Sequence, residues 1–227
     1  NPVSQKTQVQ RYAVGAGGSQ GDAIGAPVDV MDIKPIWSAG TELGKVSDYV
    51  TQRASYTDKA NTGRYILTGI DRNGDGQIGM NATDETFDFV PSVFADNGVD
   101  QYYRLLGLKS TDADEAENIV QYIRGEDIPG YRNRRIDVDG DGTLDPVLLG
   151  DIVNSSPLSV GRPSSGYDLA FGDHTYREFR QKYQNRRQMV YVGANDGMLH
   201  GFDAATGEET FAYLPAAVIT HGSTTGG

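Results

Sequence analysis

Aspartates at alternate positions of one short loop are the side chains whose spacing is most typical of metal chemistry in this sequence. Counted from the first aspartate, carboxylates stand at loop positions 1, 3, 5 and 9, which are Asp137, Asp139, Asp141 and Asp145. Gly142 at position 6 permits a sharp turn, and Thr143 at position 7 would contribute its backbone carbonyl oxygen. Calcium takes about six to eight hard oxygen ligands, and alternate residues of a tight loop can point at one centre. Because four crowded carboxylates would repel one another without a cation, the loop predicts a Ca²⁺ site.

A second loop repeats the beginning of this pattern earlier in the chain. Its expected ligands are Asp71, Asn73, Asp75 and Gln77. Gly76 again stands at position 6, and Ile78 at position 8 is the usual apolar anchor. Position 9 is a glycine, which would leave that ligand to water, and Ala82 at position 12 cannot supply the usual bidentate carboxylate. Asp84 or Glu85 can substitute for it, so we expect a second Ca²⁺ site here.

Neither loop matches an EF-hand. The loop at Asp71 follows a strand-like segment. The loop at Asp137 leads into Pro146 and Leu148, where an EF-hand needs a closing glutamate. The loops start at residues 71 and 137, too far apart for a tandem dockerin. We therefore expect calcium loops on a β scaffold, with a structural role that replaces the disulfides this chain lacks.

Periodicity predicts a mixed first half. Residues 1–30 are polar and glycine-rich, with an alternating edge strand near residues 9–14, and one or two short helices follow from residue 35. Residues 64–70 are typical of a strand that runs into the first aspartate loop. Residues 111–124 predict a surface helix that Thr111 caps and Gly125 ends.

Beyond residue 135 the pattern predicts an all-β region. The expected strands are residues 157–160, 188–192, 198–202 and 210–214, with turn residues between the last three. Four short antiparallel strands form one propeller blade or a small sandwich sheet. The fold class is therefore mixed α+β: an α/β lead-in over 1–135, a calcium loop and blade over 136–218, and a flexible tail over 219–227.

Composition excludes several classes of protein. The 227 residues carry a net charge of −11 and no cysteine, which excludes a disulfide scaffold and thiol catalysis and disfavours nucleic acid as a partner. The apolar runs are far too short to span a membrane. The chain starts at Asn1, without a secretion signal, so we expect a processed protein or a fragment.

Other candidate sites are weaker. The histidines His174, His200 and His221 are widely spaced, and His200 on a predicted strand is most often a packed or rim residue. Asp173-His174 lacks the other ligand motifs of a metallophosphatase, and Ser155 or Ser156 lacks a nucleophile elbow. We expect no catalytic residue and no bound organic cofactor.

Several motifs together resemble the PilC/PilY family of calcium-binding tip adhesins and assembly factors of type IV pili. They are Leu149-Gly150-Asp151-Ile152-Val153-Asn154-Ser155-Ser156-Pro157, Val190-Tyr191-Val192-Gly193-Ala194-Asn195-Asp196-Gly197-Met198-Leu199-His200 and Phe202-Asp203-Ala204-Ala205-Thr206-Gly207-Glu208, and residues 190–208 are the densest part. Upstream pieces also match the stretch before the family's propeller: Pro35-Ile36-Trp37-Ser38-Ala39-Gly40, residues 64–68 and Tyr122-Ile123-Arg124-Gly125.

The resemblance implies a quinoprotein-like β-propeller without quinone chemistry, calcium bound by Asp137, Asp139, Asp141 and Asp145, and a non-enzymatic role at the pilus tip. It implies an extracellular or cell-surface location, with association to the outer membrane, and minor pilins, other tip subunits and a host or surface receptor as partners. One blade cannot bury both faces of its sheet, so we also expect the remaining blades on another chain or precursor. Two alternatives stay open: a fragment of a quinone-dependent dehydrogenase, and a structural module of another secreted filament.

Overall fold

The computed structural model describes residues 8–14, 20–29, 35–58, 62–71, 75–78, 85–95, 102–109, 112–137 and 141–222. The chain divides into two compact units, Asn1–Ile36 and Trp37–Gly227. In the first unit, β1 (Gln8–Val14) and β2 (Gln20–Asp29) pair antiparallel, with Tyr12 opposite Ala23. The strand predicted near residues 9–14 is confirmed, whereas β2 was expected to be loop because its glycines and small residues carry little apolar alternation.

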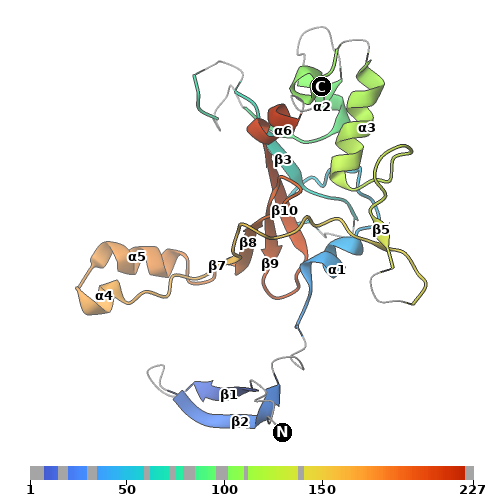
Figure 1. The fold of residues 1–227 in the computed structure, drawn as a ribbon. Helices are drawn as coiled ribbons and strands as arrows, with labels where there is room; N and C mark the ends of the chain where they lie inside the picture. Colours follow the sequence, from blue (N-terminus) through green and yellow to red (C-terminus); the bar gives the residue numbers. More distant parts are fainter. Residues whose placement is uncertain are drawn as a thin grey trace. The chain divides into compact units, whose positions relative to one another are not determined.

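The second unit is built on one mixed sheet, whose described strands have the order β4-β3-β10-β9-β8-β7 (Figure 1). Four of them form an antiparallel blade: β7 (Leu158–Val160), β8 (Met189–Gly193), β9 (Leu199–Asp203) and β10 (Glu209–Pro215). These are the four strands that the sequence predicts, each within about two residues of its expected ends. No closed propeller is present among the described residues, so the sheet is a partial propeller at most.

Two strands from the lead-in extend this blade. β3 (Ile66–Gly69) lies parallel to β10, with Ala212 opposite Ile66, and β4 (Thr86–Asp88) pairs antiparallel with β3. The expected strand over residues 64–70 is thereby confirmed. The sheet combines strands from both sides of the boundary expected at residue 135, which stays a prediction.

Helices cover the face of the sheet that carries Ile66 and Ala212. They are α1 (Ala39–Gly44), α2 (Pro91–Phe94), the 3₁₀ helix η4 (Tyr102–Leu106), α3 (Ala113–Arg124) and α6 (Ala216–Gly222). The main core joins β3 and β10 to α2, η4, α3 and α6, and its fully buried members include Phe89, Phe94 and Val120. A smaller cluster of Leu43, Val46, Tyr49 and Leu148 lies beside it.

Helix α3 confirms the surface helix predicted over residues 111–124, with a shifted start. Thr111 lies outside the described residues, and Asp112 occupies the N-cap position without a capping side-chain hydrogen bond. Gly125 ends the helix as expected, with a φ of 125° that favours glycine.

The prediction of an all-β second half is wrong. Between β7 and β8 the chain forms α4 (Tyr167–Ala170) and α5 (His174–Lys182), and α6 follows β10, so residues 219–222 of the expected tail are helical. The charged segment between β7 and β8 has no alternation, and Asp173 starts a helix there by accepting hydrogen bonds from the backbone N–H groups of Thr175 and Tyr176. No helix among the described residues is long and apolar enough to cross a bilayer.

Candidate calcium loops and a buried charge network

The loop at Asp137 joins two short strands, β5 (Arg135–Ile136) and β6 (Asp145–Pro146), which pair antiparallel with Ile136 opposite Asp145. The carboxylate of Asp137 accepts a hydrogen bond from the backbone N–H of Gly142 at 3.0 Å. The carboxylate of Asp141 accepts one from the N–H of Thr143 at 2.7 Å. Gly142 has a φ of 87°, so the sharp turn expected at position 6 is present.

The loop at Asp71 repeats this local geometry. It leaves β3 and returns to β4, which is antiparallel to β3. The Asp71 carboxylate accepts from the N–H of Gly76 at 2.9 Å, the Asp75 carboxylate accepts from the N–H of Gln77 at 2.8 Å, and Gly76 has a φ of 78°. The two loops therefore share one hydrogen-bond pattern at positions 1, 5, 6 and 7, each between antiparallel strands rather than between the helices of an EF-hand.

Contacts behind the Asp71 loop tie it to the sheet. A Cβ placed on Gly69 would lie 2.8 Å from a methyl group of Ile78 and 2.8 Å from the Tyr213 hydroxyl, so the apolar anchor at position 8 packs against β3. Glu85, a candidate substitute ligand, is 1% exposed, and its carbonyl oxygen accepts from the N–H of Ile70 at 2.8 Å. Asp84, the other candidate, lies outside the described residues.

The described part of each loop is incomplete as a metal site. Two predicted ligands, Asp139 and Asn73, lie outside the described residues. Among the residues that are described, no three histidine or carboxylate side chains are placed so as to hold a metal ion. The predicted ligands offer only oxygen donors, which would suit Ca²⁺ better than zinc or another soft metal, and the two metal sites stay predictions.

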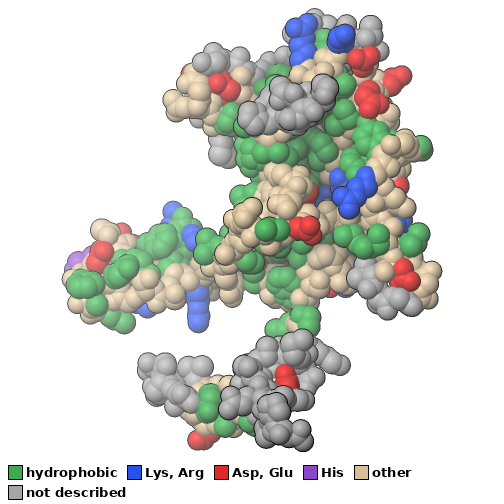
Figure 2. Space-filling model, viewed as in Figure 1, with side chains coloured by type: hydrophobic (Ala, Val, Ile, Leu, Met, Phe, Trp, Pro, Cys, Tyr) green, Lys and Arg blue, Asp and Glu red, His purple; other side chains and the backbone are tan. Residues whose placement is uncertain are grey.

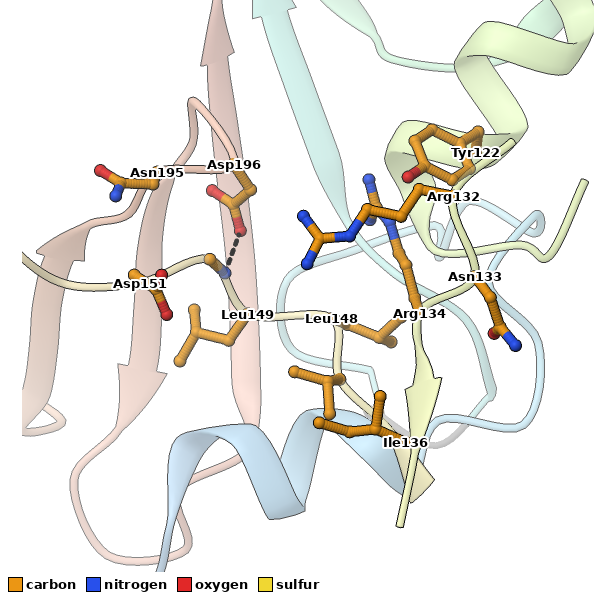
Figure 3. Close-up of a pocket in the computed structure, with 12 residues that line it drawn as sticks. Tyr122, Arg132, Asn133, Arg134, Ile136, Leu148, Leu149, Asp151, Asn195 and Asp196 are labelled. Atoms are coloured by element: carbon orange, nitrogen blue, oxygen red, sulfur yellow. Dashed lines mark hydrogen bonds between the residues drawn. The ribbon is translucent and has the colours of Figure 1, made fainter. Parts of the chain in front are cut away.

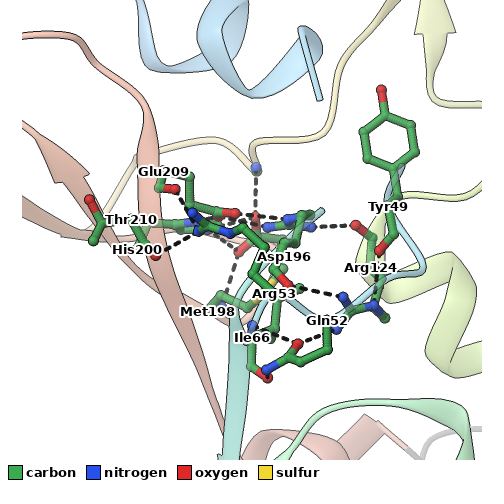
Figure 4. Close-up of polar contacts among 12 residues, drawn as sticks. Tyr49, Gln52, Arg53, Ile66, Arg124, Asp196, Met198, His200, Glu209 and Thr210 are labelled. Atoms are coloured by element: carbon green, nitrogen blue, oxygen red, sulfur yellow. Dashed lines mark hydrogen bonds and ion pairs between the residues drawn. The ribbon is translucent and has the colours of Figure 1, made fainter. Parts of the chain in front are cut away.

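A buried charge network connects the blade to the lead-in (Figure 4). The Arg64 guanidinium forms a two-point ion pair with the Glu209 carboxylate, through N–O distances of 2.8 and 2.7 Å. Glu209 Oε1 also lies 2.8 Å from His200 Nδ1, and the Asp196 carboxylate lies 3.0 Å from His200 Nε2. His200 is fully buried, and its ring stacks on Phe202 at an interplanar angle of 10°. The histidine thus stands between two carboxylates.

Arg124, the last residue of α3, extends this network. Its guanidinium donates to the carbonyl oxygens of Tyr49 at 2.9 Å, Phe89 at 2.7 Å and Thr51 at 2.9 Å. It also donates to the Arg64 carbonyl, while Arg64 donates to the Arg124 carbonyl. Arg124 therefore satisfies four backbone acceptors in three segments of the lead-in.

The network shifts the pKa values of its members. Burial lowers the pKa of His200, but hydrogen bonds and charges from Asp196 and Glu209 outweigh it and raise this pKa to about 9. Burial raises the pKa of Glu209, yet Arg64 and His200 hold it well below its usual range. Burial and the neighbouring charge of Arg64 lower the pKa of Arg124 to about 10. At neutral pH the network therefore contains a protonated histidine and two ionised carboxylates.

A hollow of about 290 Å³ lies between the β5–β6 hairpin and the turn from β8 to β9 (Figure 3). Asp196 marks its inner wall, where the carboxylate accepts from the N–H of Gly150 at 3.1 Å. Arg134 lines it from the hairpin side, with its guanidinium carbon 4.0 Å from the centre of the Tyr122 ring. The hairpin that carries the Asp137 loop is thus one wall of a recess that reaches the charge network.

The weaker candidates have structural roles. Asp173 caps α5, and exposed His174 is the first residue of that helix. The Ser155 hydroxyl donates to the Gly193 carbonyl, so it connects two segments of the blade. His221 lies in α6, but its side chain is not described. The sequence did not reveal the place of His200 between Asp196 and Glu209, because Arg64, which completes the group, lies 145 residues from Glu209.

Comparison with known proteins gives consistent matches. The family model of the PilY1 β-propeller domain matches residues 149–224. The type IV pilus biogenesis factor PilY1 of Pseudomonas aeruginosa PAO1 is 32% identical over 183 residues, which cover 78% of this chain and 15% of that protein. A PilY1 homolog of Xylella fastidiosa is 44% identical over 103 residues, or 44% of this chain and 8% of that protein. No solved structure matches the chain.

The chain spans less than a sixth of the length of these curated relatives, with 15% of one and 8% of the other. The match of residues 149–224 begins just before the blade and ends beyond α6, and the longer match to the Pseudomonas protein extends beyond it. The residues that the family model matches include Asp196 and His200, which belong to the charge network. The chain therefore belongs to the PilC/PilY family, as a segment in which residues 149–224 match the PilY1 β-propeller domain.

Proposed function

We propose that the chain is a calcium-binding, non-enzymatic part of a type IV pilus biogenesis factor that acts through protein contacts at the cell surface, at the pilus tip. The observation that carries the pilus role is the match over 78% of the chain to a protein named type IV pilus biogenesis factor PilY1. Minor pilins or other tip subunits are the partners that such a role requires, and a host or surface receptor is a further one.

Calcium binding rests on the repeated loop geometry. In both loops the carboxylates at positions 1 and 5 accept hydrogen bonds from backbone N–H groups, and the glycine at position 6 has a positive φ. Asp137, Asp139, Asp141, Thr143 and Asp145 would hold one ion, and Asp71, Asn73, Asp75 and Gln77 the other. An ion at Asp137 would hold the two-residue strands β5 and β6 together and so maintain one wall of the hollow beside Asp196.

The remainder of the propeller is the proposed partner of the sheet face opposite the helices. Since side chains alternate across a strand, Leu67 and Phe211 lie opposite to the core residues Ile66 and Ala212. A largely apolar hollow of about 520 Å³ on that face is lined by Tyr65, Leu67, Met189, Tyr191 and Phe211. Burying these side chains against a following blade would stabilise both sheets by removing apolar surface from water.

No observation favours the dehydrogenase alternative. A quinone site requires a complete propeller and residues that clamp the cofactor, and the described residues form one blade. The same blade could serve another secreted filament, but the relatives named above are pilus biogenesis factors.

The test exchanges the matching stretch of Pseudomonas aeruginosa PilY1 for residues 37–222 of this chain and counts surface pili. We expect the chimera to support piliation, and the same chimera with Asp141→Asn to support markedly less. Asp151→Asn is the matched control, because it removes an equal charge from an exposed carboxylate outside both loops. A chimera that folds and reaches the surface but forms no pili would contradict the proposed role, and equal piliation of all three would contradict the role of calcium.

A further inference from the structure

The segment between β7 and β8 differs in charge from the rest of the chain. Residues 162–187, which we call the arm, carry six arginine and lysine residues against three acidic ones, in a protein whose net charge is −11. The arm contains α4 and α5, which pack on each other (Figure 1). It thus places a local excess of positive charge on an acidic protein.

Most of the arm's negative charge is already engaged. Asp168 is 3% exposed and forms an ion pair with Arg180, which joins α4 to α5. Asp173 caps α5 through the N–H groups of Thr175 and Tyr176. Glu178 is the third acidic residue of the arm, all of which the structure describes, and it neither forms such an ion pair nor caps a helix. The cations Arg162, Arg177, Lys182 and Arg186 form no ion pair among the described residues.

Aromatic rings form a continuous strip along the arm. The distance between ring centres is 5.2 Å for Tyr167 and Tyr176. It is 5.9 Å for Tyr176 and Phe179, and 4.9 Å for Phe179 and Tyr183. Phe171 joins the strip through Tyr167 at 6.2 Å. Two cations border the strip at the other end, with the Arg186 guanidinium carbon 4.2 Å and the Lys182 ammonium 5.3 Å from the Tyr183 ring centre.

The end of α4 exposes two large apolar side chains to solvent. Leu169 is 78% exposed and Phe171 is 79% exposed, on either side of the end of α4. Figure 2 shows hydrophobic side chains along the arm with arginine and lysine at its borders. Apolar side chains exposed to this extent mark a surface that contacts a membrane or another protein.

We propose that the arm docks onto an anionic lipid surface, with Leu169, Phe171 and the aromatic strip in the interfacial layer and the unpaired cations against lipid phosphates. A short helix of low overall hydrophobicity, with aromatic residues on one side and arginine and lysine beside them, is typical of elements that lie in a membrane interface. Charge complementarity selects anionic over neutral lipid, since each cation near such a surface adds to the attraction. This contact is independent of the calcium loops and adds a lipid partner to the protein partners proposed above.

The test is co-sedimentation of the full chain with vesicles of phosphatidylcholine alone and with a quarter phosphatidylglycerol, in EDTA so that calcium cannot bridge lipid and protein. We expect binding to the anionic vesicles only. Leu169→Ser with Phe171→Ser should abolish it, and Arg177→Gln with Lys182→Gln should weaken it about 30-fold, because each cation contributes about fivefold. Added salt should weaken the binding of the wild-type chain.

Matched controls separate a specific arm from general stickiness. Leu158→Ser changes a side chain that is 62% exposed outside the arm, and Lys109→Gln with Arg132→Gln removes two exposed cations from the lead-in. Both should leave vesicle binding unchanged. Absence of binding to anionic vesicles, or binding that survives the Leu169 and Phe171 replacements, would overturn the proposal and leave a protein as the arm's partner. Neither result would test calcium binding, because EDTA removes calcium from this assay.

Discussion

His200 carries a positive charge in the interior because two carboxylates flank it. Its Nδ1 lies 2.8 Å from the Glu209 carboxylate and its Nε2 lies 3.0 Å from the Asp196 carboxylate. Arg64, which pairs with Glu209, supplies the second positive charge that balances the two carboxylates. Such a network is costly to desolvate, but removing one member leaves an uncompensated buried charge, which costs about 3 to 5 kcal/mol. The residues therefore stabilise the fold as a set.

The raised pKa of His200 predicts a pH-dependent stability. With a pKa of about 9 in the folded chain and about 6.5 when unfolded, the histidine contributes its stabilisation fully below pH 6.5 and loses it as pH rises through 9. The shift corresponds to about 3 kcal/mol of unfolding free energy. Urea unfolding from pH 6 to 10 measures it.

A control variant identifies the titrating group. His200→Leu should be less stable at pH 6 and should lose most of the decline between pH 6.5 and 9, whereas exposed His174→Leu should retain that decline. A decline of unchanged size in His200→Leu would show that another group titrates. The sequence placed His200 on a strand, but no local pattern could reveal a pair formed between Arg64 and Glu209 across 145 residues.

At the scale of elements, a close contact joins Trp37, the first residue of the second unit, to the turn between β9 and β10. Trp37 Nε1 donates to the Ala204 carbonyl at 2.9 Å. A Cβ on Gly207 would lie 2.6 Å from the Trp37 ring, and Gly207 has a φ of 78°. The indole therefore packs directly on Gly207, in a turn whose positive φ and lack of space both require glycine.

Gly207→Ala should destabilise the chain by about 2 kcal/mol or more, because strain at positive φ adds to displacement of the indole. Gly130→Ala is the matched control: Gly130 has a φ of 89°, but an added Cβ would meet nothing within 4 Å. We expect it to cost about 1 kcal/mol, from backbone strain alone. Equal losses in chemical unfolding would show that the contact with Trp37 contributes nothing.

Elements with strong periodicity were predictable. Each blade strand and α3 carries a clear apolar pattern, and glycines such as Gly125 mark real ends. The α4–α5 insertion was missed although Tyr176, Phe179 and Tyr183 stand at helical spacing, because the segment is short and highly charged and its aromatic residues pack on one another. Likewise, the pattern of β3 indicates a strand but not its parallel pairing with β10, which depends on contacts between distant segments.

For the whole molecule, the lead-in and the blade form one folding unit from Trp37 onward. They share a sheet through β3 and β10, a core, and the network of Arg64, Arg124 and Glu209. The blade alone would leave Glu209 without its ion-pair partner Arg64 and the edge of β10 without β3.

Residues 149–222 expressed alone should therefore show no cooperative thermal transition, whereas residues 37–222 should unfold in one cooperative step. Circular dichroism with calorimetry distinguishes these outcomes. A cooperative transition in the shorter segment would mean that the lead-in is an accessory to an autonomous blade. Residues 37–222 that melt like the full chain would confirm that the first unit does not stabilise the second.

Isothermal titration of the chelator-treated chain with Ca²⁺, with thermal melting in parallel, tests the central claim most directly. The account predicts two binding events and a rise in melting temperature, with one event lost in Asp141→Asn and the other in Asp75→Asn. Asp151→Asn should retain both. No heat of binding and a melting temperature that is the same in calcium and in EDTA would contradict the claim that these loops hold calcium.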